Sequence, residues 1–370
     1  MRILIFPRNI RCSDNPYGAL LYRDMPSFGV EVHGFSIWQA LWGRYDVFHL
    51  HWPEYYLNRS LLKALFGSLL VLLSTVWLRA RGTRILWTVH NPHSHSHAHP
   101  TMEAWFWEIF TRMLDGFVSL SDSCSKWIET DIPHLRRTKS SVIPHGHYRQ
   151  AYPATIDPIR ARDAMGIAPA QTVLLFFGGV SSYKNVPHLI NTFRDASLPD
   201  TIMLISGRPQ RRHRPLVETA AGTDRRIKLD LRRIPTNEVQ LLFSAADLVV
   251  LPFSDIMHSG SAMLALSFDR PVLVPARGSL PELQMRVGSE WVRTYDGELT
   301  AAILKDAAAW AKAANRESRP DLSCFDWPQI VEATIELYSR LCSQPLPLQS
   351  PSQQPANVEH VAMLKHLPPA

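Results

Sequence analysis

One stretch of the sequence places a glycine and two serines where a helix is expected to begin. Residues 251–275 fit a strand end, a loop, a helix, a turn and a second strand, and Ser259, Gly260 and Ser261 follow His258 at the start of that helix. Free backbone N–H groups and the positive end of a helix dipole bind phosphate, while serine at this position also caps helices. The segment therefore predicts either a diphosphate site or an ordinary capped helix.

Two other loops favour the diphosphate interpretation. Gly179 and Lys184 follow a strand predicted at residues 172–177, and Arg208 follows one predicted at residues 201–206. Each cation taken alone could be a solvated surface residue. The carboxyl ends of parallel strands meet at one edge of a sheet, where ligands bind. Glycine gives access to the backbone there and a cation supplies charge, so the three loops together predict a site for the phosphates of a nucleotide-sugar donor.

Three side chains in the first half are candidates for a general base, which must be an ionisable group in a loop after a strand. Asp14 follows the first predicted strand, Glu54 follows the third, and His90 ends the fourth. Each also has a structural alternative. Asp14 and Glu54 could cap or solvate the next helix, and His90 could be a buried strand-end residue or could orient a sugar. Asp14 and Glu54 are the favoured bases, and the residues alone do not rank them.

The elements that would position these residues alternate between strands and helices. The strands are predicted at residues 2–6, 30–37, 45–51, 84–90, 116–121 and 141–144, then at 172–177, 201–206, 227–231, 248–252 and 272–275. This alternation predicts parallel sheets with helical crossovers. We expect domains at residues 1–155 and 165–325 joined by a proline-dotted linker at 148–163, a helix at 326–343, and a disordered proline- and glutamine-rich tail at 344–370.

Composition narrows the class of protein. The chain has 370 residues, a length that fits two domains. Its formal net charge of +6 fits a partner that is either phosphorylated or an anionic membrane surface. Its four cysteines are far apart, which argues against a zinc site or disulfide framework and favours a cytosolic protein. The sequence has no GxGxxG, P-loop, zinc-finger or recognition-helix pattern, which argues against NAD enzymes, P-loop NTPases and nucleic-acid binding.

Alternating histidines follow His90 as far as residue 99 and resemble a metal site. Prolines bracket the run, and neither a carboxylate nor a cysteine accompanies it. We therefore expect a mobile polar loop at the acceptor site, with no metal and no other cofactor.

Residues 61–78 form an apolar segment with basic residues at both ends, namely Arg59, Lys63, Arg79, Arg81 and Arg84. Its length is close to that of a membrane span. The favoured interpretation is a mostly buried crossover helix. The alternatives are a crossover helix that also enters the membrane surface, and a true span, which would interrupt the strand–helix alternation.

On these residues the sequence resembles the GT-B glycosyltransferases. The resemblance covers about residues 1–343 and implies two Rossmann-like domains facing across a cleft. It also implies a donor site in the second domain, an acceptor site in the first, and a last helix that crosses back to the first. Ile256 and Leu264 stand where a large retaining group of these enzymes carries two glutamates, which favours an inverting enzyme. The Asp-x-Asp motif of metal-dependent glycosyltransferases of the other major fold is missing.

The arrangement is most similar to the xanthan- and acetan-type GDP-mannose:glycolipid β-1,4-mannosyltransferase family of bacterial exopolysaccharide synthesis. The similarity rests on Asn15-Pro16-Tyr17 and on residues 46–54, 88–91 and 258–261. It implies mannose transfer from GDP-mannose to the glucuronic acid of a polyprenyl-diphosphate-linked oligosaccharide, at the inner face of the plasma membrane. The acceptor-binding residues would be Asn15, Tyr17, His51 and Trp52.

Three alternatives stay open. The first is a GT-B transferase that uses a UDP-sugar, and the second is a non-catalytic nucleotide-sugar-binding protein. The third is an epimerase or phosphorylase on the same fold. A phosphorylase would need a lysine that binds pyridoxal phosphate, and the sequence around the lysines does not indicate such a residue.

Overall fold

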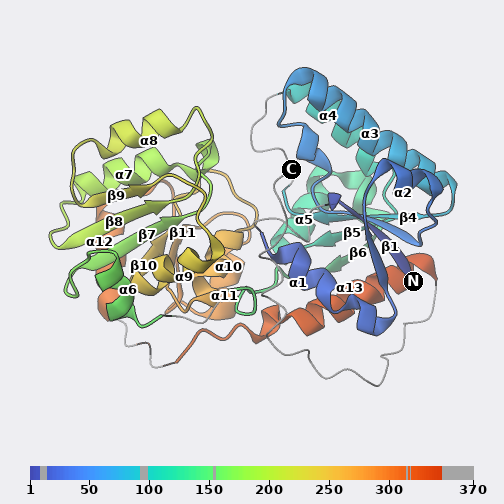
Figure 1. The fold of residues 1–370 in the computed structure, drawn as a ribbon. Coiled ribbons are helices and arrows are strands. Elements are labelled where there is room, and N and C mark those ends of the chain that lie inside the picture. The colour runs from blue at the N-terminus through green and yellow to red at the C-terminus, as the bar shows by residue number, and fades with distance from the viewer. Residues whose placement is uncertain (9–14, 92–98, 153–155, 314–315, 317, 344–370) are drawn as a thin grey trace.

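The computed structural model describes residues 1–8, 15–91, 99–152, 156–313, 316 and 318–343. Asp14, the histidines between residues 92 and 98 and the tail at 344–370 lie outside this part of the chain. Figure 1 shows two α/β lobes connected by two crossings of the chain.

The first lobe is built on a parallel sheet with the strand order β2-β1-β3-β4-β5-β6. The strands are β1 (Arg2–Phe6), β2 (Glu31–Gly34), β3 (Val47–Leu50), β4 (Arg84–Val89), β5 (Gly116–Ser119) and β6 (Lys139–Val142). Its central strands are mostly apolar and buried on both faces, as expected of a parallel sheet covered by helices, and His49 is a buried polar exception in β3. The helices are α1 (Tyr17–Arg23), α2 (Ile37–Trp42), α3 (Leu61–Ala80), α4 (Pro100–Thr111) and α5 (Asp122–Asp131).

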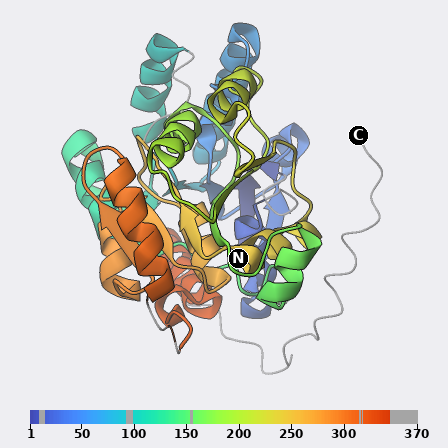
Figure 2. The same cartoon turned by 90° about the vertical axis from the view of Figure 1, so that its left-hand side faces the viewer.

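The second lobe repeats the plan with the order β12-β11-β10-β7-β8-β9, and helices cover both faces of its sheet (Figures 1 and 2). The strands are β7 (Thr172–Phe177), β8 (Thr201–Ser206), β9 (Ile227–Asp230), β10 (Leu248–Val250), β11 (Val272–Pro275) and β12 (Val292–Tyr295). The helices are α6 (Pro158–Ala164), α7 (Val186–Asp195), α8 (Arg214–Ala221), α9 (Thr236–Ala245), α10 (Gly260–Ser267), α11 (Leu280–Val287) and α12 (Ala301–Ala313). The prediction of two parallel α/β sheets is confirmed.

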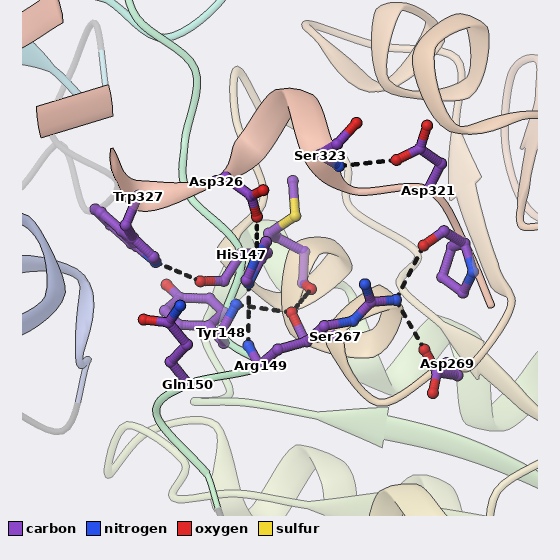
Figure 3. Close-up of polar contacts among 12 residues, drawn as sticks. His147, Tyr148, Arg149, Gln150, Ser267, Asp269, Asp321, Ser323, Asp326 and Trp327 are labelled. Atoms are coloured by element: carbon purple, nitrogen blue, oxygen red, sulfur yellow. Dashed lines mark hydrogen bonds and ion pairs between the residues drawn. The ribbon is translucent and has the colours of Figure 1, made fainter. Parts of the chain in front are cut away.

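Helix α13 (Trp327–Cys342) then returns to the first lobe, where it lies against α1 and β6 (Figure 1). The predicted crossing helix is therefore confirmed. Figure 3 shows how its start is tied to the chain that connects the lobes. The indole Nε1 of Trp327 donates to the carbonyl of His147 (2.7 Å), and the backbone N–H of Tyr148 donates to Ser267 Oγ at the end of α10 (2.8 Å).

Some predicted boundaries were wrong. The strand predicted at residues 30–37 ends at Gly34, because Ser36 caps α2 by accepting a hydrogen bond from the N–H of Gln39 (3.1 Å). The predicted linker contains α6, which begins after the cap residue Asp157. Strand β12 was not predicted, because this short edge strand is half exposed at Arg293 and Thr294 and therefore lacks a continuous apolar run.

Helix α3 connects β3 to β4, so the predicted crossover position is confirmed, but the expected burial is wrong. Its buried face consists mainly of small residues, among them Ala64, Gly67 and Ser68. A Cβ atom on Gly67 would lie 2.1 Å from the ring of Tyr56, so this close packing requires glycine. Many of the large apolar side chains of α3 point outward instead, and Phe66 is 68% exposed, although Leu72 and Leu78 are buried.

Candidate active site

The three phosphate-binding loops predicted in the second lobe meet at the carboxyl edge of its sheet. A Cβ atom on Gly178 would lie 3.4 Å from Ser261 Oγ and 3.8 Å from Lys184 Nζ. Gly207 lies directly beside them in a left-handed conformation (φ 140°), and a Cβ there would be 2.1 Å from the Gly178 carbonyl oxygen. Only glycine permits this approach, so the loops after β7, β8 and β10 form one surface.

Lys184 and Arg208 open into a common cavity of about 390 Å³ on this surface. The first lobe contributes Asn58 to its wall, so the cavity lies between the two lobes. The remaining lining residues come from the second lobe and are Gly179, Val180, Ser181, Tyr183 and Gln210. Backbone, hydroxyl and cationic groups thus line a space large enough for a ligand.

Lys184 holds its charge in an unusual environment. Its ammonium nitrogen lies 4.4 Å from the ring centre of Phe253 and 5.2 Å from that of Tyr183. Among the described residues, no carboxylate lies within ion-pair distance of it. Burial lowers the pKa of Lys184 from 10.5 to about 8. A half-buried cation without a counterion is costly, and an anionic ligand would reduce that cost.

The start of α10 has features of both alternatives predicted from its sequence, a capped helix and a diphosphate site. Ser259 caps the helix by accepting a hydrogen bond from the N–H of Ala262 (3.0 Å), so the structural role is real. Ser261 instead directs its hydroxyl toward Gly178. His258 shares a hydrogen bond with Ser279 through Nδ1 (3.1 Å), and its Nε2 is buried with no partner among the described residues.

The predicted donor residues therefore divide between two cavities. Gly179, Lys184 and Arg208 line the larger one, whereas His258 and Ser259 line a second of about 40 Å³ together with His145 of the first lobe. Gly260 lies where the lobes come close, because a Cβ on it would be 3.2 Å from the Tyr148 hydroxyl.

In the first lobe, a chain of hydrogen bonds connects the cleft to the crossing helix. His90 Nε2 and His51 Nδ1 are 3.0 Å apart, and His51 Nε2 lies 2.5 Å from the hydroxyl of Tyr22. That hydroxyl is 3.0 Å from His49 Nδ1, which also lies 2.7 Å from the hydroxyl of Tyr338 on α13. All five side chains are buried.

The predicted acceptor residues surround His90. The ring of Trp52 stacks on the imidazole with ring centres 4.4 Å apart, and Tyr17 meets it edge-on at 4.9 Å. Asn15 Oδ1 accepts hydrogen bonds from the N–H of Tyr17 (3.0 Å) and from the hydroxyl of Tyr148 (2.9 Å). Asn15, Tyr17, His51 and Trp52 thus lie together on the side of the cleft opposite the donor loops.

Burial keeps this group of imidazoles neutral. It lowers the pKa of His49 to about 3, of His145 to about 4 and of His258 to about 3. The pKa values of His51 and His90 are lowered in the same direction, first by burial and then by neighbouring histidines. Each neutral imidazole has one donor and one acceptor nitrogen, so the hydrogen bond between them links the tautomer of His90 to that of His51.

Glu54 lies in the 3₁₀ turn Pro53–Tyr56, and its carboxyl is buried. Burial raises its pKa to about 8, a shift reinforced by Glu103 and opposed by hydrogen bonds from its own backbone and from Asn91. Neither Glu54 nor His90 lines either of the two cavities described above. Within the described residues, no group of three histidine, cysteine or acidic side chains is placed to hold a metal ion.

His49 and Tyr338 belong to the hydrogen-bond chain of the first lobe and were not predicted as site residues. His49 precedes His51 by two positions in a strand, and this spacing places both side chains on one face, so a signal for it existed. Tyr338 is 289 residues from His49 and gave no local signal.

Comparison with known proteins agrees with this geometry. No family model matches the chain. Two curated proteins named GDP-mannose:glycolipid 4-beta-D-mannosyltransferase, both from Xanthomonas campestris pv. campestris, are 34% identical to it over 339 residues. The match covers 91% of this chain and 91% of each relative.

Solved structures share the fold at low sequence identity. Sucrose-phosphate synthase from Thermosynechococcus elongatus superposes with a TM-score of 0.71 at 16% identity, covering 92% of this chain and 99% of that one. Anabaena Alr3699/HepE in complex with UDP and glucose gives 0.65 at 16% identity, covering 92% and 100%. The GT-B fold predicted from the sequence is thereby confirmed.

Proposed function

The chain belongs to the GDP-mannose:glycolipid 4-beta-D-mannosyltransferase family and is a glycosyltransferase, and we propose that it moves mannose from GDP-mannose to the glucuronic acid of a polyprenyl-diphosphate-linked oligosaccharide. The observation that supports the donor half of this proposal is the half-buried charge of Lys184, which has no described carboxylate partner and lies beside Ser261 and Arg208. Such a surface fits a diphosphate. The relatives' name supports mannose as the sugar and a glycolipid as the acceptor.

The donor loops would stabilise the leaving group. As the acceptor oxygen attacks the anomeric carbon, the bond from that carbon to the diphosphate oxygen breaks and its electron pair leaves with GDP. Lys184, Arg208 and the N–H groups at the start of α10 would offset this negative charge. We propose that these protein groups do so without a metal ion.

The acceptor hydroxyl must also lose a proton. Of the three candidates, Asp14 lies outside the described residues, and Glu54 is protonated at neutral pH because its pKa is about 8. His90 is neutral, faces Tyr17 and Trp52, and has no hydrogen bond at Nδ1 from a described residue. We therefore propose that His90 Nδ1 accepts the proton during an inverting displacement. The charge of the bound donor would raise the pKa of the imidazole and strengthen it as a base.

The proposal is tested by transfer assays with GDP-mannose and a glucuronic-acid-terminated lipid-linked acceptor in EDTA, with the configuration of the new bond read by NMR. We expect a β-mannoside from the α-linked donor. His90→Gln should lower kcat about 100-fold or more and leave GDP binding unchanged. Glu54→Gln is the matched control, because glutamine resembles the protonated carboxyl. An inactive Glu54→Gln variant beside an active His90→Gln variant would make Glu54 the base.

We further propose that the protein binds peripherally to the inner membrane surface through α2 and α3. The exposed side chains that form this α2–α3 face are Ile37, Trp38, Leu41, Trp42, Leu61, Leu62, Leu65, Phe66, Leu73, Val76 and Trp77. Contiguous exposed apolar surfaces of this kind mark interaction sites, and tryptophans favour the membrane interface. Arg81 joins the two helices by donating to the Leu41 carbonyl (2.6 Å) and adds positive charge for anionic lipids.

A further inference from the structure

A groove in the first lobe lies outside the catalytic cleft, between α4 on one side and α5 with the following turn Pro133–Arg137 on the other. Its volume is about 440 Å³, within the range of ligand pockets. The lining residues are Pro100, Glu103, Ala104, Trp107, Glu108, Thr111, Trp127, Asp131, Ile132, Pro133 and His134. None of them lines either cavity of the cleft.

Two tryptophans give the groove flat apolar surfaces. Trp107 on α4 packs against the buried ring of Trp87 with ring centres 5.0 Å apart, so its position is fixed by the core. Trp127 approaches from α5. The indole Nε1 of Trp107 is buried and has no acceptor among the described residues.

The polar groups of the groove are mostly hydrogen-bond acceptors. Glu103 and Glu108 come from α4 and Asp131 from the end of α5, and Glu108 is ion-paired with Arg112 at the end of α4. His134 and Thr111 share a hydrogen bond (3.0 Å) across the groove. Carboxylates accept hydrogen bonds from hydroxyl groups and repel phosphates and uronic acids. A ligand that is rich in hydroxyl groups and apolar on one face matches this lining, whereas a phosphate or a uronic acid does not.

We propose that this groove is a second carbohydrate site, which binds neutral pyranose rings between α4 and α5. A pyranose places its C–H face on an indole and directs its hydroxyls outward, which matches two tryptophans flanked by carboxylates. That the rings come from the glycan of the acceptor or product rests on the proposed function. The binding of a neutral sugar does not, because the groove shares no lining residue with the cleft.

The test is calorimetric titration and saturation-transfer NMR of the full chain with cellobiose as the neutral probe and glucuronate as the anionic one. We expect cellobiose to bind and glucuronate not to bind. Trp127→Ala and the milder surface change Asp131→Asn should each weaken cellobiose binding, with Trp127→Ala raising Kd about tenfold or more. Trp105→Ala is the matched control, because Trp105 lies on α4, is 43% exposed and does not line the groove.

Lys184→Met separates this proposal from the proposed function, since it should abolish GDP binding and leave cellobiose binding intact. Unchanged affinity in both Trp127→Ala and Asp131→Asn would overturn the groove assignment, as would binding of free arginine in place of cellobiose. Absence of any cellobiose binding by the unmodified chain would overturn it as well. None of these results depends on whether GDP binds.

Discussion

Replacing Lys184 with methionine should stabilise the empty protein while destroying its donor site. The ammonium of the half-buried Lys184 lies over the rings of Phe253 and Tyr183, and no described carboxylate pairs with it. Methionine keeps the unbranched apolar chain and removes only the charge. Stability and binding should therefore change in opposite directions, which a residue with a merely structural role would not produce.

The size of the stability change follows from the pKa of Lys184. The fall from 10.5 to about 8 corresponds to about 3 kcal/mol of unfolding free energy at pH 7. The side chain is not fully shielded from solvent, so we expect about 2 kcal/mol. The unfolded chain binds more protons than the folded chain between pH 8 and 10.5, so stability recovers as pH rises through this window. The advantage of Lys184→Met should shrink there.

The assay is urea denaturation at pH 7 and near pH 10, combined with thermal shift in the presence of GDP. Lys126→Met serves as the control, because Lys126 is exposed on α5 and should change neither quantity. We expect Lys184→Met to be more stable than the unmodified chain at pH 7 and to show no shift with GDP. A variant that is less stable at pH 7, or that keeps the GDP-induced shift, would refute the reasoning.

Three further outcomes are expected. Tyr338→Phe removes the hydroxyl that lies 2.7 Å from His49 Nδ1, so it should lower the free energy of unfolding in urea by about 1 kcal/mol. It should also lower kcat without changing the KM for GDP-mannose, and an unchanged kcat would contradict a positioning role. Burial lowers the pKa of His145 to about 4, so between pH 6.5 and 4 the unfolded chain binds a proton that the folded chain does not, and the free energy of unfolding should fall as the pH is lowered through this window. A free energy of unfolding that stays constant between pH 7 and 5 in urea titrations would argue against buried neutral imidazoles. The double variant Trp38→Ala, Trp42→Ala should sediment less with anionic vesicles and keep its thermal midpoint, since both residues are more than 70% exposed. Full retention of vesicle binding would contradict membrane binding through the α2–α3 face.

The donor side of the cleft could be predicted from sequence because it depends on local features. Gly179, Lys184 and Arg208 each follow an apolar run that ends abruptly, and the geometry of a parallel sheet brings such ends together. The contact of Gly207 with Gly178 could not be read in advance, since it depends on how two loops cross.

The acceptor side of the cleft was harder to predict from the sequence, because its organisation depends on contacts between residues that are far apart in the chain. His51 and His90 are adjacent only because β3 and β4 pair, and Tyr338 joins them only because α13 crosses between lobes. The apolar residues of α3 showed that the segment is a helix, but not which face is covered. That face was decided by Gly67, where the ring of Tyr56 occupies the space of a side chain.

The central claim is that a metal-independent guanosine diphosphate site lies at the carboxyl edge of the second sheet. The most direct test is calorimetry of the purified chain with GDP, GDP-mannose and UDP in the presence of EDTA. The account predicts that GDP and GDP-mannose bind, that chelation does not weaken them, and that UDP binds more weakly. Preference for UDP would contradict the proposed donor, and a loss of GDP binding on chelation would contradict charge neutralisation by Lys184, Arg208 and α10 alone.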